Sequence, residues 1–178
     1  GSSPTLVNYR KALEIFISKY HPIVIALNTF SVIDDNLIDY RIACNPIRLM
    51  ADLDSYLCIK QPLITPLSML PKSLSSKLSH KKILDYGIGI SKEGFEFNEK
   101  YGIIPSQLVF AYVLAFIASG KAKKAFLAGF EGYEIGDIRN LEINKLIEEF
   151  RKKENNLSLI SITPSKYSGL ESISIYGM

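Results

Sequence analysis

The chain has 178 residues, of which 47% are hydrophobic and 22% charged, and its formal net charge at pH 7 is +3. This balance is that of an ordinary globular protein, and the length suits one well-buried domain rather than two. The richest apolar segment, at 108–119, is shorter than the roughly 20 residues that cross a bilayer, and no signal-peptide pattern opens the chain. We expect a single domain over 1–178, located in the cytoplasm, without a membrane span.

The charged and sulfur-containing residues exclude several function classes. The lysine-rich stretches at 72–82 and 121–124 are typical of solubilising turns, so we expect no nucleic-acid partner. Cys44 and Cys58 lie in apolar, strand-like runs without a CxxC spacing, which predicts buried free thiols. His21 precedes a proline and His80 lies in a Lys/Ser turn, so we expect neither a metal site nor a Cys/His nucleophile.

The first half of the chain alternates between helix and strand patterns. Apolar residues at a spacing of three to four predict a helix over 6–17. Continuous apolar runs at 22–28, 40–44, 55–59 and 63–65 predict strands covered on both faces, and helices are expected at 46–53 and 68–78. This alternation predicts an α/β fold with a mostly parallel sheet and helices on both faces.

The second half continues the same alternation. Residues 83–90 have strand character interrupted by Gly87 and Gly89, and 92–101 is expected to be a surface hairpin or loop, either a variable excursion or a flap over the site. The remaining expected elements are a helix at 106–119, a strand at 124–129, a helix at 137–155 capped by Asp137, a strand at 157–162 and a short edge strand at 173–176.

The start of the chain is unusual because a loop leads directly into the first helix. A domain rarely begins in this way, so we expect the chain to be a portion of a longer polypeptide, although Gly1 and Ser2 need not be native. The run from Gly1 to Thr5 can cradle a phosphate through its backbone N–H groups at the helix start. Alternatively it is a helix cap, with Ser3 or Thr5 capping and Pro4 in the first turn.

Polar residues at the predicted ends of strands are the candidate binding residues. In open α/β sheets the loops beyond the carboxyl ends of strands bind ligands. Asn28 and Asn45 each follow an apolar run, where an amide can bond a base or a ribose or simply close its own turn. Arg48 follows within one helical turn and can reach a phosphate or a carboxylate.

Three acids gather near the loop after the strand at 124–129. Glu131, Glu134 and Asp137 can hold a hard cation or serve as acid and base. They belong to one short stretch and have no second acidic cluster elsewhere in the sequence. We therefore expect no metal, and Glu134 and Asp137 are the candidates for a catalytic carboxylate.

Several motifs in the same order resemble a known family. They are a Gly-x-x-Pro-Thr opening, an Asn that ends the next strand, a Pro-Ser entry to an apolar helix, a strand ending in Gly-Phe-Glu-x-Tyr, and a last strand running into Thr-Pro-Ser-Lys. Together they resemble the Rossmann-like nucleotide-sugar domain of bacterial lipooligosaccharide sialyltransferases and motility-accessory-factor glycosyltransferases. The runs at 1–28 and 159–177 also resemble the accessory domain found C-terminal to HMG-CoA-lyase-like aldolases in surface-polysaccharide gene clusters.

This resemblance implies a three-layer α/β/α fold and a nucleotide or nucleotide-sugar ligand of the CMP type, with no other cofactor. The loop from Thr163 to Lys166 would close the pocket. With Arg48 added from the pattern above, the candidate nucleotide-binding residues are Gly1, Ser2, Ser3, Pro4, Thr5, Asn28, Asn45, Arg48, Ser106, Gly129, Glu131, Tyr133, Thr163 and Ser165.

One departure from the family leaves the activity open. The transferases have a histidine general base before the penultimate helix, and this segment of the chain has none. The leading hypothesis is therefore a nucleotide-sugar-binding accessory domain of an aldolase-like protein in bacterial polysaccharide biosynthesis. The alternatives are an active glycosyltransferase with a carboxylate base, and a non-catalytic module that docks on the aldolase part or forms homo-oligomers.

Overall fold

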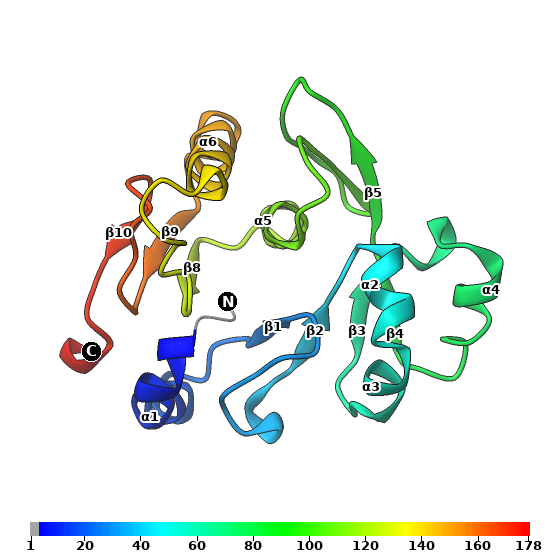
Figure 1. Ribbon diagram of the computed structural model, residues 1–178, viewed down its shortest axis with the longest axis horizontal. Helices are drawn as coiled ribbons and strands as arrows, with labels where there is room; N and C mark the ends of the chain where they lie inside the picture. Colours follow the sequence, from blue (N-terminus) through cyan, green and yellow to red (C-terminus); the bar gives the residue numbers. More distant parts are fainter. Residues whose placement is uncertain (1–3) are drawn as a thin grey trace. The chain divides into compact units, whose positions relative to one another are not determined.

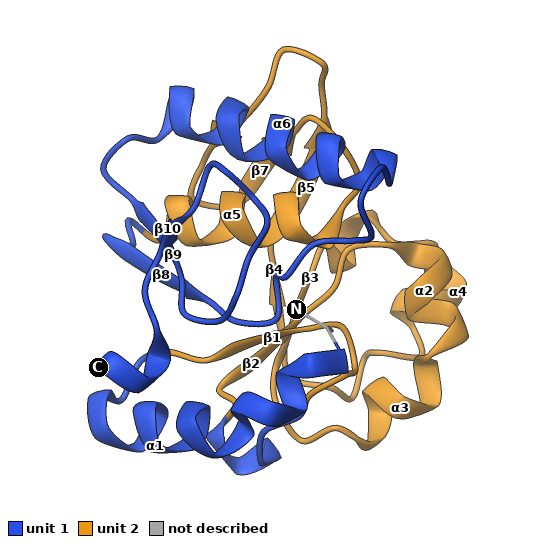
Figure 2. Ribbon diagram, turned by 60° about the vertical axis from the view of Figure 1, so that its left-hand side comes forward, with its two compact units in different colours: residues 1–22, 32–37, 121–178 blue, residues 23–31, 38–120 orange. Residues whose placement is uncertain are grey.

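The structure is a computed structural model that describes residues 4–178. The chain divides into two compact units (Figure 2). Unit 1 comprises Gly1–Pro22, Val32–Leu37 and Lys121–Met178, and unit 2 comprises Ile23–Ser31 and Ile38–Gly120. The prediction of a single domain stays a prediction.

Unit 2 contains a four-stranded parallel sheet. Its strands are β1 (Ile25–Leu27), β2 (Tyr40–Ile42), β3 (Leu63–Thr65) and β4 (Ile83–Asp85), in that spatial order (Figure 1). The predicted strands at 22–28 and 40–44 are confirmed with shorter bounds, and the strand predicted at 63–65 is confirmed with the same bounds. Their apolar composition follows from burial, since Ile42, Leu63 and Ile64 have no exposed surface.

The chain passes from this sheet into a second one at Tyr86. The N–H of Tyr86 donates to the carbonyl of Thr65 on β3, whereas the N–H of the next residue, Gly87, donates to the carbonyl of Lys100. Successive residues of a strand point their N–H groups to opposite sides. Residues 83–90 are therefore one extended run whose first half pairs with β3 and whose second half, β5 (Gly87–Ile90), pairs in parallel with β7 (Tyr101–Ile104).

The predicted surface hairpin at 92–101 is confirmed in part. Strand β6 (Glu96–Phe97) pairs antiparallel with β7. The sequence reading missed β7 itself, and Phe95 is fully buried, so the hairpin contributes to the core and is more than a surface excursion.

Helices cover both faces of the sheet in unit 2. Helix α5 (Val109–Ser119) packs on the face that carries Tyr86, whose hydroxyl lies 2.5 Å from the hydroxyl of Ser119 and whose ring meets Phe116 edge to face. On the opposite face, α2 (Pro46–Ala51), α3 (Leu53–Cys58), the 3₁₀ turn η3 (Leu67–Met69) and α4 (Lys72–Ser75) enclose a core that includes Leu49, Tyr56, Leu63 and Leu74.

The strand predicted at 55–59 is wrong, because this segment belongs to α3. Leu49, Leu53 and Tyr56 are spaced four and three residues apart and contact the same core, which is the period of a helix. The burial prediction for the two thiols is half right. Cys44 is buried and Cys58 is exposed, and both are free.

Unit 1 contains a three-stranded parallel sheet in the order β10-β9-β8. Its strands are β8 (Lys124–Leu127), β9 (Ser158–Ser161) and β10 (Glu171–Ser172). The 3₁₀ turn η1 (Pro4–Tyr9) and α1 (Arg10–Tyr20) supply Leu6, Leu13 and Phe16 to a core with Ile160 of β9. Helix α6 (Ile138–Lys153) follows β8.

The edge strand predicted at 173–176 is wrong. The edge strand is β10, and Ile175–Gly177 forms the 3₁₀ turn η4. Ser174 starts this turn, because its hydroxyl accepts a hydrogen bond from the N–H of Tyr176. Apart from β6 with β7, every strand pairing within the described chain is parallel, so the predicted α/β class with mostly parallel strands, consistent with a Rossmann-like fold, is confirmed.

Close packing of β7 against α5 depends on Gly102. A Cβ atom at this position would lie 2.7 Å from the Cβ of Ala115 and 2.9 Å from the hydroxyl oxygen of Tyr86. We expect Gly102→Ala to lower the free energy of unfolding by about 1–3 kcal/mol, since an overpacked core must shift. Chemical denaturation measures the change. Gly120→Ala is the control, because its added Cβ would make only ordinary contacts at 3.5 Å, and an equal loss in both variants would contradict the packing argument.

Candidate functional site

The predicted binding residues fall into both units. Gly1, Ser2 and Ser3 lie outside the described residues. Unit 2 holds Asn28, Asn45, Arg48 and Ser106. The others belong to unit 1 and are Pro4, Thr5, Gly129, Glu131, Tyr133, Thr163 and Ser165, together with the candidate catalytic acids Glu134 and Asp137.

In unit 1 the loops that follow β8 and β9 leave the sheet together. The two strands are parallel, with Leu127 paired to Ser161, so their carboxyl ends coincide. Just beyond them, the N–H of Gly129 donates to the hydroxyl of Thr163 over 3.0 Å. Thr163 is buried, and Gly129 has a φ of 73°, a conformation that favours glycine. The structure thus brings these two predicted site residues into direct contact.

Further hydrogen bonds join the same two loops. The hydroxyl of Ser165 donates to the carbonyl of Phe130 over 2.7 Å, and the N–H of Lys166 donates to the carbonyl of Glu131 over 3.1 Å. The hydroxyl of Thr5 donates to the carboxylate of Glu131. Thr5 therefore acts through its side chain on the β8 loop. Helical structure begins with η1 at Pro4, so the predicted cap at Ser3 lies outside the described residues.

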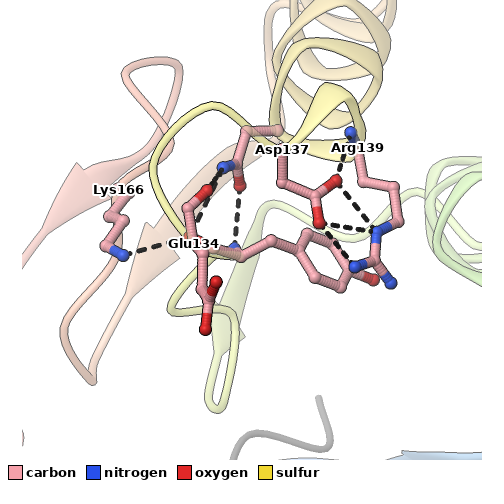
Figure 3. Close-up of polar contacts among 6 residues, drawn as sticks. Glu134, Asp137, Arg139 and Lys166 are labelled. Carbon is pink, nitrogen blue, oxygen red and sulfur yellow. Dashed lines mark hydrogen bonds and ion pairs between the residues drawn. The ribbon is translucent and has the colours of Figure 1, made fainter.

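Hydrogen bonds from α6 and from the β9 loop fix the loop between β8 and α6 (Figure 3). The side-chain amide of Asn140 accepts from the N–H of Tyr133 over 2.8 Å and donates to the carbonyl of Glu134 over 2.9 Å. From the β9 loop, the ammonium of Lys166 donates to the carbonyl of Tyr133 over 3.0 Å. Gly132 has a φ of 93°, and a Cβ there would lie 3.2 Å from both Asn140 and Lys166. The loop is thus shaped before any ligand arrives.

Asp137 starts helix α6, as predicted. Its carboxylate accepts from the N–H of Arg139 over 2.9 Å and pairs with the guanidinium of the same residue. These interactions, with the side-chain hydrogen bond from Arg139 as the largest contribution, lower the pKa of Asp137 to about 2. A carboxylate with so low a pKa is a weak proton acceptor at neutral pH, so the geometry disfavours Asp137 as a general base and leaves Glu134 as the candidate.

The exposed groups at this end of unit 1 have mixed polarity. The guanidinium of Arg139 stacks 3.8 Å from the ring centre of Tyr133. Lys166 adds a second cation, and the half-buried Glu131 supplies a carboxylate that can accept hydrogen bonds from hydroxyl groups. Nucleotides are recognised by three kinds of group: cations, which attract phosphate; aromatic rings; and carboxylates.

In unit 2, Asn28 lies in a loop shaped by a buried cation. Arg41 of β2 is 1% exposed, and its guanidinium donates to the carbonyls of Thr29 and Phe30 over 3.0 Å each. Asn28 itself has a φ of 55°. Sequence analysis missed Arg41. An arginine within the apolar run at 40–44 indicates a buried cation, and a buried cation must be hydrogen-bonded.

Asn45 closes its own turn, which was one of the two alternatives for this residue. Its side-chain oxygen accepts from the N–H groups of Ile47 and Arg48 over 3.0 and 3.1 Å, capping α2. Arg48 is exposed on that helix. The neighbouring thiol of Cys44 donates weakly to the carbonyl of Gln107 over 3.9 Å, which brings Ser106 to the same edge of the sheet. Burial raises the pKa of Cys44 to about 12, so it is no nucleophile.

Two further polar residues end strands of this sheet and were missed. Thr65 ends β3 with a fully buried hydroxyl that has no hydrogen-bond partner among the described residues, and the hydroxyl of Ser106 shares that property. Asp85 ends β4, and its carboxylate accepts from the N–H of Ser68 over 3.2 Å. Each lies within an apolar run whose composition indicates a strand and gives no sign of a site.

Within residues 4–178, no group of three or more His, Cys, Asp or Glu side chains is placed to hold a metal ion. No helix in that range is long and apolar enough to cross a membrane. Comparison of the chain with protein-family models, curated proteins and solved structures found no match. The resemblance to sialyltransferase-like and aldolase-associated domains therefore stays a prediction.

The hydrogen bond between Gly129 and Thr163 gives a direct test of the loop geometry. Thr163→Val removes the hydroxyl and leaves a buried N–H without its acceptor, so we expect a loss of about 1–3 kcal/mol in the free energy of unfolding. Thr163→Ser keeps the hydroxyl and should lose less. Urea denaturation compares the two variants, and a larger loss in the serine variant would contradict the assigned role of the hydroxyl.

The pairing of Asp137 with Arg139 predicts a pH dependence. Because the folded pKa of Asp137 is depressed, its contribution to stability is complete above the unfolded pKa, near 4, and is lost as the pH falls toward about 2. We expect Arg139→Gln to raise the pKa of Asp137, measured by carbon NMR of the carboxyl group. Lys145→Gln, which removes the partner of Glu149 elsewhere on α6, should leave this pKa unchanged.

Proposed function

We propose that the chain binds a nucleotide or a nucleotide sugar at the loops that follow β8 and β9. The observation that carries this proposal is the joining of these loops at the carboxyl ends of two parallel strands, where Gly129 and Thr163 are hydrogen-bonded. This is the place at which open α/β sheets bind ligands. The proposed ligand contacts are the exposed side chains of Tyr133 and Lys166 and the half-buried carboxylate of Glu131.

Each contact has a chemical reason. The carboxylate of Glu131 accepts hydrogen bonds from ribose hydroxyl groups, and Thr5 orients it. Lys166 and Arg139 provide positive charge for phosphate oxygens. The ring of Tyr133 is 40% exposed and offers a surface for a base or a sugar.

The biological setting rests on the resemblance described above. Following it, we place the domain in bacterial surface-polysaccharide biosynthesis, as an accessory domain of an aldolase-like protein with a CMP-type ligand. Of the alternatives, transfer chemistry would depend on Glu134, because the carboxylate of Asp137 is engaged by Arg139.

Calorimetric titration with CMP, CDP, UDP, GDP and CMP-sialic acid tests the proposal. We expect binding of one nucleotide, weakened about tenfold or more by Tyr133→Ala, since loss of a stacking and orienting ring costs on the order of 1 kcal/mol or more. Ile135→Ala is the matched control, because that side chain is 97% exposed in the same loop.

Absence of binding across the panel would contradict the proposal and favour a docking module. Release of free sugar or sugar transfer from CMP-sialic acid, abolished by Glu134→Gln, would instead establish the transferase alternative.

A further inference from the structure

One edge of β5 in unit 2 has no strand beside it in the described chain. The sheet order is β5-β7-β6, so β5 is terminal. The N–H groups of Gly87 and Ser91 donate to carbonyls of Lys100 and Ile104 on the β7 side, over 2.8 and 3.1 Å. By the alternation of a strand, the N–H groups of Ile88 and Ile90 face the opposite side.

The outward N–H group of Ile88 is bonded to a weak acceptor. Ile88 donates to the thioether sulfur of Met69, with nitrogen and sulfur 3.2 Å apart. A thioether is a poor acceptor compared with the carbonyl that a strand N–H normally finds. Met69 is 59% exposed, so a ligand can reach its side chain from solvent.

The outward side of β5 is the side on which β3 pairs with β4. The N–H of Tyr86 still reaches Thr65, the last residue of β3, and beyond it the chain turns into η3. Figure 1 shows β5 continuing past the ends of β3 and β4. Past the end of β3, the turn η3 contacts the start of β5, and Met69 of this turn covers the N–H of Ile88. No strand of the described chain pairs with the outward edge of β5.

A groove of about 720 Å³ lies at this place. Gly87 and Gly89, which have no side chains, line it together with Met69 and Tyr101. Asp85 and Lys100, which carry opposite charges, also line the groove. Within residues 4–178, the hydrogen bonds that Asp85 accepts are long ones, of 3.2 and 3.3 Å, from the N–H of Ser68.

We propose that this groove binds an extended peptide segment that pairs with β5 as an added strand. A carbonyl of the peptide replaces the sulfur of Met69 as the acceptor for Ile88, and Ile90 donates to a second carbonyl, which is the pattern of strand addition. Every second side chain of the bound peptide points toward Gly87 and Gly89. A basic one meets Asp85 and an acidic one meets Lys100. This inference is independent of nucleotide binding in unit 1.

Nitrogen-15 NMR titration tests the proposal with the capped peptide acetyl-Val-Lys-Val-Glu-Val-amide and its order-reversed counterpart acetyl-Val-Glu-Val-Lys-Val-amide. We expect one of them, at about 1 mM, to shift the amide resonances of Ile88 and Ile90 more than those of Gly87 and Gly89. Methylation of the peptide's backbone nitrogens and carbonyl replacement by thioamides should abolish the shifts.

Met69→Ala provides the matched variant, because it removes the competing sulfur. We expect it to speed hydrogen exchange at Ile88 and to tighten peptide binding by about twofold to tenfold, the equivalent of one modest hydrogen bond. Met50→Ala, at an exposed methionine of α2, should change neither. No shift with either peptide in the Met69→Ala variant would overturn the proposal. So would shifts of Ile88 and Ile90 that depend on protein concentration alone, which would mean that a second copy occupies the edge.

Discussion

The hydrogen bond from the N–H of Gly129 to the hydroxyl of Thr163 is the constraint on which the candidate site depends. Parallel pairing of β8 with β9 brings the two loops to one end of the sheet, and this bond fixes their separation. The positions of Glu131, Tyr133 and Lys166 follow, because the carbonyl of Glu131 accepts from the N–H of Lys166 and the backbone of Tyr133 bonds the side chains of Lys166 and Asn140. A buried contact thus determines the geometry of exposed groups.

Glu131, Glu134 and Asp137 are similar in the sequence but make different interactions in this network. Asp137 caps a helix and pairs with Arg139, so its pKa is low and its lone pairs are occupied. Glu131 receives the hydroxyl of Thr5, and Glu134 contributes its backbone carbonyl to Asn140. The carboxylate of Asp137 is thus engaged by Arg139, and Glu134 stays the candidate for a catalytic carboxylate.

Apolar periodicity predicted most of the fold and part of the site. Strands β2, β3, β8 and β9 and helices α1, α5 and α6 lie where the sequence places them, because each buries a continuous or periodic apolar face. The segment at 55–59 was ambiguous since a short apolar run fits a strand or a helix, and its tertiary contacts through Tyr56 decided the outcome. The joining of Gly129 with Thr163 was foreseeable from strand order, whereas the burial of Arg41 and the role of Met69 depend on contacts between distant segments.

Mapping a bound nucleotide by nitrogen-15 NMR tests the central claim most directly. Nucleotide binding at the β8 and β9 loops predicts that CMP or a related nucleotide shifts the amide resonances of residues 129–134 and 163–166 together. Shifts confined to other segments, or none at saturating nucleotide, would contradict the assignment of the site to these loops.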